Sequence, residues 1–100
     1  MTKKGNWNEQ DEASIKAIIV NLINQKQMFR NLGEKGELPQ TFKIQNSREY
    51  VLGIFTGIAI NLFANYWVGE HEAGLLPDDL EYLYHKISTF HDMIIDGLFE

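Results

Sequence analysis

The feature that most constrains this chain is a run of nineteen uncharged residues, Tyr50 to Val68. Only Thr56, Asn61 and Asn65 within it are clearly polar. The length is close to the ~20 residues needed to cross a bilayer, so lipid and a protein interior must both be weighed. The asparagines and two glycines inside the run, with a glutamate next to each end, favour a protein interior. We therefore predict that this segment does not span a membrane.

Apolar side chains recur every three or four residues, which predicts three helices at about residues 9–32, 47–69 and 77–98. Asn46 is a suitable N-cap for the second helix, and Pro77 suits the first turn of the third. Glycines and a proline within residues 33–46 interrupt the helical pattern between the first two helices. We expect Phe42 and Ile44 in this connection to plug the end of the bundle.

These segments predict a single all-α domain over residues 1–100, a three-helix antiparallel bundle with the apolar helix at its centre. A helix that is apolar all round must be covered all round, and two neighbouring helices cover only about two sides. We therefore predict a homodimer that associates through the central helix. The expected interface residues are two glycines that permit close approach and two neighbouring isoleucines: Gly53, Gly57, Ile54 and Ile58.

The alternative to a dimer is that side chains outside the helices cover the central helix. Trp7, Phe42 and Ile44 are the large apolar residues available for this. Because monomeric proteins rarely expose large apolar patches, one of the two arrangements is required.

Composition narrows the function. The 100 residues are 44% hydrophobic and include no cysteine, which excludes disulfides and thiolate metal sites. The net charge of −5 speaks against binding to nucleic acid or to anionic membranes. The basic start at residues 1–6 is followed by polar and acidic residues rather than by an apolar segment, so we expect a cytoplasmic protein.

Four polar residues lie at apolar positions of the predicted helices. One interpretation is a hydrogen-bonded polar layer that fixes helix register or oligomeric state. The other is a ligand pocket at the helix or subunit interface, in which a lysine holds an anion. The four residues are Lys26, Asn61, Asn65 and His91.

The sequence contains no recognisable catalytic motif, and we predict a non-enzymatic protein without a cofactor. Glu81, His85 and Asp92 share a predicted helix face at spacings of four and seven residues. The metal-binding motifs His-Glu-x-x-His and Glu-x-x-His are both absent, and a solvated acidic face explains the grouping, so we predict no metal site.

Acidic residues line the outer face of the third predicted helix. Eight acidic residues and one basic residue give residues 50–100 a charge of −7. One interpretation is that this face is only solvated. The other, which we favour, is that the protein is a small acidic regulator or inhibitor and that this face docks on a basic surface of a protein partner. The expected contact residues, including two possible apolar anchors, are Asp78, Glu81, Tyr82, His85, Asp92, Met93 and Asp96.

Overall fold

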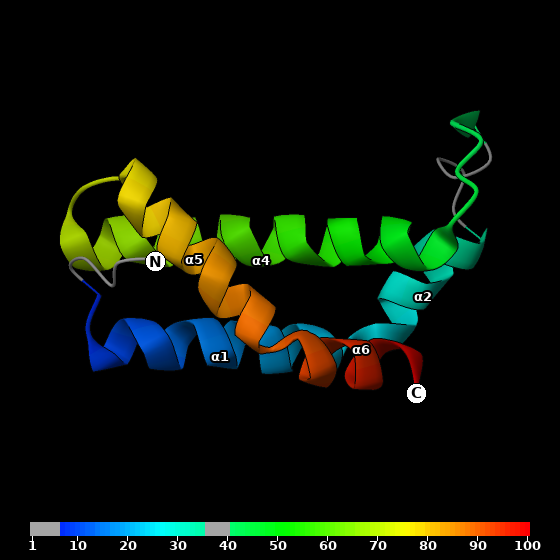
Figure 1. Ribbon diagram of the computed structural model, residues 1–100, viewed down its shortest axis with the longest axis horizontal. Helices are drawn as coiled ribbons and strands as arrows, with labels where there is room; N and C mark the ends of the chain where they lie inside the picture. Colours follow the sequence, from blue (N-terminus) through cyan, green and yellow to red (C-terminus); the bar gives the residue numbers. More distant parts are fainter. Residues whose placement is uncertain (1–6, 36–40) are drawn as a thin grey trace.

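The computed structural model describes residues 7–35 and 41–100, and the regular structure in these ranges is entirely α-helical (Figure 1). The all-α prediction is therefore confirmed. Within these ranges there are five helices rather than the three predicted. They are α1 (Glu9–Ile23), α2 (Lys26–Lys35), α4 (Ser47–His71), α5 (Pro77–Thr89) and α6 (His91–Phe99).

The first predicted helix, residues 9–32, is broken into α1 and α2. A tight turn ends α1, in which the Gln25 N–H donates to the Leu22 carbonyl at 2.9 Å. In a continuous helix Lys26 would point toward the core, where an unpaired ammonium group is costly. The turn instead leaves Lys26 exposed as the first residue of α2. Helix α2 also continues through Gly33, which we expected to end it; part of the connection over residues 33–46 lies outside the described residues.

The third predicted helix, residues 77–98, is also broken. Phe90 separates α5 from α6, and its N–H donates to the Ile87 carbonyl at 3.0 Å. The break leaves His91 exposed as the first residue of α6, although the periodicity had placed it among apolar residues. Figure 1 shows α6 turning away from the direction of α5.

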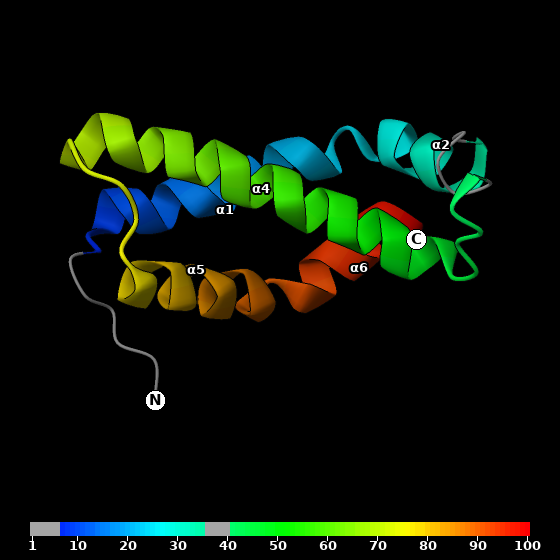
Figure 2. The ribbon, with the colours of Figure 1, turned by 90° about the horizontal axis from the view of Figure 1, so that it is seen from above.

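Helix α4 matches the predicted central helix and extends two residues past its expected end. The Asn46 side chain caps it by accepting the N–H of Glu49 at 3.0 Å, as predicted. The helix ends at Glu72, whose backbone is left-handed with φ 56°. Figures 1 and 2 show α1 running along α4 in the opposite direction and α2 leading from the end of α1 toward the start of α4, with α5 and α6 returning on another side.

The core is built on one row of α4 in which every fourth residue is buried. Residues of α1 and α2 pack against this row, α6 packs on α1 and α2, and at one end the Phe29 and Phe55 rings lie 5.3 Å apart. The buried row of α4 consists of Val51, Phe55, Ala59, Phe63 and Trp67.

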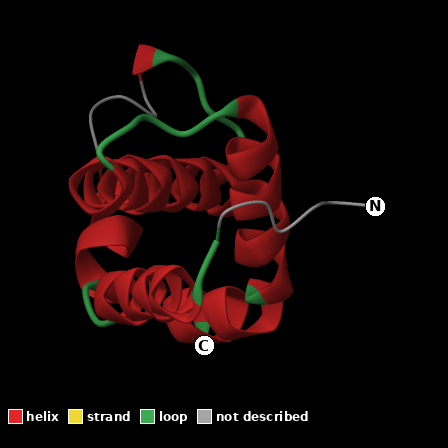
Figure 3. Cartoon of the chain, turned by 90° about the vertical axis from the view of Figure 1, so that its left-hand side faces the viewer, coloured by secondary structure: helices red, strands yellow, loops and turns green. Residues whose placement is uncertain are grey.

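Trp7 joins α5 to α4. Its ring stacks on Phe63, with centroids 4.8 Å apart, and meets the Tyr82 ring of α5 edge-on at 4.8 Å. It also lies 5.4 Å from the Trp67 ring. Figure 3, which looks along α1 and α4, shows α5 standing steeply beside them. Trp7 therefore fills the interior between α4 and α5 and is not available to cover the outer side of α4.

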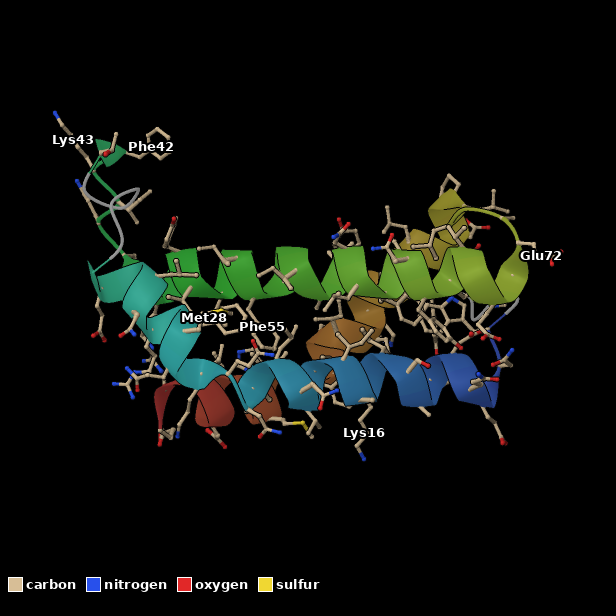
Figure 4. The ribbon with its side chains drawn as sticks, turned by 180° about the vertical axis from the view of Figure 1, so that it is seen from behind. Lys16, Met28, Phe42, Lys43, Phe55 and Glu72 are labelled. Atoms are coloured by element: carbon tan, nitrogen blue, oxygen red, sulfur yellow. The ribbon has the colours of Figure 1, made fainter. Side chains whose placement is uncertain are left out.

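Phe42 and Ile44 do not plug the end of the bundle, and that prediction is wrong. Phe42 is 66% exposed and Ile44 is 38% exposed. Figure 4 shows Phe42 and Lys43 on a turn that projects away from the helices. The buried rings between α2 and α4 are instead those of Phe29 and Phe55.

Candidate functional site

The outer side of α4 carries a second row of residues spaced by four, which is exposed. We call this row the α4 seam; it consists of Gly53, Gly57, Asn61 and Asn65. Ile54 and Ile58 beside it are half-buried, and the neighbouring Leu62 is 42% exposed. Only 28% of the most apolar 18-residue window of α4 is buried. The single chain therefore leaves uncovered a strip of glycines and asparagines that is bordered by larger apolar residues.

The glycines of the chain fall into two kinds. A Cβ atom at Gly33 would lie 2.4 Å from Val51 Cγ2, and one at Gly97 would lie 2.5 Å from Ile23 Cγ2, so these two are needed for packing within the chain. A Cβ atom at Gly53 or Gly57 would meet nothing within 4 Å. Glycine inside a helix costs about 1 kcal/mol relative to alanine. Nothing within the described part of the chain explains that cost at the α4 seam.

The four polar residues predicted to turn inward are all exposed in the single chain: Lys26, Asn61, Asn65 and His91. They lie on three helices, and the structure does not bring them together as one pocket. Lys26 and His91 are exposed because each follows a helix break, whereas Asn61 and Asn65 belong to the α4 seam. The prediction of a buried polar layer is therefore wrong for the single chain.

A different, mostly apolar pocket of about 300 Å³ lies where α4 faces the break between α5 and α6. His91 reaches its edge, but Lys26 and the two asparagines do not line it. Its lining residues are Leu52, Thr56, Tyr84, Ile87, Ser88, His91, Ile94 and Ile95.

The predicted acidic face is divided between two helices. Asp78, Glu81 and His85 are exposed on α5, and Asp92, Met93 and Asp96 are exposed on α6. Because α6 turns away at Phe90, the face bends instead of following one helix axis (Figure 1). The third acidic residue of α5, Asp79, is buried and accepts the N–H of Leu76 at 3.2 Å.

Tyr82, predicted as an anchor for a partner, is half-buried and engaged within the chain. Its hydroxyl donates to Glu12 Oε1 at 2.7 Å, and Lys86 Nζ lies 3.0 Å from the other oxygen of Glu12. The hydrogen bond to Glu12, together with burial, raises the pKa of Tyr82 to about 12. These contacts tie α5 to the first turn of α1.

A buried carboxylate closes the end of the molecule where α1 begins and α4 ends. Asp11 is fully buried and accepts the Tyr66 hydroxyl at 2.9 Å and the backbone N–H of Asn8 at 3.0 Å. His71 Nε2 lies 3.1 Å from both carboxylate oxygens, and its ring stacks on Trp67 with centroids 3.7 Å apart. Burial, more than the bond to Asp11, raises the pKa of Tyr66.

This cluster was not predicted from the sequence. The spacing of Asn8 and Asp11 was a usable signal, because it fits the reciprocal capping box that the structure shows. Within residues 7–35 and 41–100, no group of three or more histidines and carboxylates is arranged to hold a metal ion.

Comparison of the chain with protein-family models, curated proteins and solved structures finds no match.

Replacing Asp11 by asparagine should lower the free energy of unfolding by about 1–3 kcal/mol, because buried partners lose a charged acceptor. Urea unfolding followed by circular dichroism measures the change. Asp92→Asn is the matched control: its side chain is 98% exposed, and it should shift stability by no more than about 0.5 kcal/mol. Equal stability of the two variants would contradict the structural role of Asp11.

Tyr82 should be recognisable in an alkaline titration of the folded protein. Its pKa is raised from 10.0 to about 12, so its contribution to stability is complete below pH 10 and is lost as the pH rises toward 12. Tyrosinate absorbance should show a late step that Tyr82→Phe removes. The same change at exposed Tyr84 should leave that step in place, and its loss there would refute the assignment.

Proposed function

We propose that this chain is a small cytoplasmic, non-enzymatic interaction protein that pairs with a second copy through the α4 seam. The uncovered strip on α4 carries the proposal. Exposed Leu62 and half-buried Ile54 and Ile58 border the strip, and exposed apolar side chains gathered on one helix face mark interaction sites. The two open glycines add support, because small residues let two helix backbones approach closely.

A second copy is the simplest partner for this strip. A seam with a four-residue period, flanked by ridges of larger side chains, fits the same surface of another copy related by a two-fold axis. Ile54 and Ile58 would lie in the grooves beside the partner's glycines. Asn61 and Asn65 would pair their amides across the axis, a role attested for asparagine at helical interfaces.

The acidic face would remain free in such a pair, because it lies on α5 and α6 rather than on the seam. We propose that it binds a protein partner with a basic surface, and that charge complementarity makes this encounter fast and sensitive to salt. Among the expected anchors, Met93 is exposed and available, whereas Tyr82 is held by Glu12.

A bilayer is the competing environment for α4. By length and composition this helix could cross a membrane, although core helices of soluble proteins pass the same test. The packing of its buried row against α1 and α2 favours the protein environment.

The substitution Gly57→Ala separates pairing from folding. A Cβ atom meets nothing in the single chain, so helix propensity should raise monomer stability by up to about 1 kcal/mol. In the pair the same methyl group should push the helices apart and weaken association on the order of tenfold. Thermal unfolding at high dilution and sedimentation velocity over a concentration series measure the two effects.

The control is Asn21→Ala, which also raises helix propensity at an exposed helical position but lies on α1, outside the seam. It should stabilise the chain without changing association. A wild-type protein that stays monomeric at all concentrations would contradict pairing, as would unchanged association of Gly57→Ala. Recovery of the protein only with bound lipid would instead support the membrane alternative.

Partner binding is tested by paired charge reversals. Glu81→Lys with Asp96→Lys should abolish capture of a basic partner, and capture by the wild type should weaken as salt rises. Glu9→Lys with Glu72→Lys changes the net charge equally at exposed sites outside the acidic face and should preserve capture. Equal loss with both pairs would show that only overall charge matters and would remove the acidic face from the proposal.

A further inference from the structure

Both arginines of the sequence, Arg30 and Arg48, line one pocket. The pocket has a volume of about 300 Å³ and lies where α2, the start of α4 and the end of α6 meet. Arg30 comes from α2 and is half-buried, whereas Arg48 comes from the first turn of α4 and is exposed. In a chain with a net charge of −5, this convergence of guanidinium groups sets the pocket apart.

Neither arginine is neutralised by an ion pair within the described ranges, where the ion pairs involve His71, Lys86 and His91. The Arg48 guanidinium lies over the Phe99 ring, 4.5 Å from its centroid. Stacking on a ring holds the guanidinium plane and leaves its N–H edge available to an oxyanion.

Backbone donors of α4 adjoin the same pocket through Ser47 and Arg48. The Asn46 side chain caps only the Glu49 N–H, and no acceptor for the N–H groups of Ser47 and Arg48 lies within the described residues. Free N–H groups at a helix start favour an anion, and here they supplement the two arginines.

We propose that this pocket binds the phosphate group of a small hydroxylated phosphate ester. Two guanidinium groups suit bidentate binding of phosphate oxygens. Glu34 and Glu100 also line the pocket. Their carboxylates repel a bare anion but accept hydrogen bonds from hydroxyl groups, so the site favours a phosphate joined to a polyol over phosphate alone. This inference is independent of pairing through the α4 seam.

The test is a titration of the isotope-labelled full chain with glycerol phosphate and with inorganic phosphate, followed by NMR at constant ionic strength. Glycerol phosphate should cause saturable shifts at the amides of Gly33, Ser47 and Arg48. Inorganic phosphate should bind the same amides more weakly. Absence of saturable shifts would overturn the proposal, and equal affinity for both probes would overturn the preference for a polyol ester.

Variants locate the site. Arg30→Gln and Arg48→Gln should each weaken glycerol phosphate binding by about tenfold, because each removes a charge-assisted donor. Lys16→Gln removes an equal charge from a side chain that points away from the molecule (Figure 4) and should have no effect. Equal weakening by Lys16→Gln would show non-specific attraction and refute the site.

Two further variants keep the test decisive if either glutamine variant fails to fold. Arg48→Lys keeps the charge but lacks the planar fork, and it should bind more weakly than wild type. Removing a negative charge from the pocket by Glu34→Gln should strengthen binding of inorganic phosphate. Unchanged affinity in both variants would contradict the proposed contacts.

Discussion

One constraint organises this molecule: α4 is apolar on nearly every side, but the chain buries only one row along it. That row, from Val51 to Trp67, provides the surface on which α1 and α2 pack, and α6 packs on those two helices. The other helices of the chain are short and are interrupted by turns, and together they cannot surround a helix of 25 residues. The opposite row, the α4 seam, is small and weakly polar, a compromise between exposure to water and contact with another helix.

The helix breaks follow from the same packing problem. Each break precedes a polar residue that a continuous helix would have directed toward the core, Lys26 in one case and His91 in the other. Turning the backbone costs less than burying an ammonium or imidazole group without a partner. In the sequence these residues looked like candidate ligands for a bound molecule; in the structure they mark where a helix restarts.

Periodicity therefore predicted the all-α class, the position of α4 and most of its core partners, because those depend on local spacing. It could not predict the breaks, since hydrophobic spacing across both is close to that of a continuous helix. Nor could it predict the two sites that long-range packing creates. Asp11 meets His71 across sixty residues, and Arg30 meets Arg48 only because α2 folds back along the start of α4. The acidic face was visible in the sequence, but its bend at Phe90 was not.

The positions of the aromatic side chains have a practical consequence. Trp7 and Trp67 are the two tryptophans of the chain, and their rings are in contact at the end where α1 begins. Tryptophan fluorescence will therefore report the opening of that end. Separation of α2 from α4 at the opposite end, where the buried rings are Phe29 and Phe55, will leave the tryptophan emission unchanged. A fluorescence unfolding curve and an amide-exchange profile of this protein would accordingly describe different events whenever its two ends loosen separately.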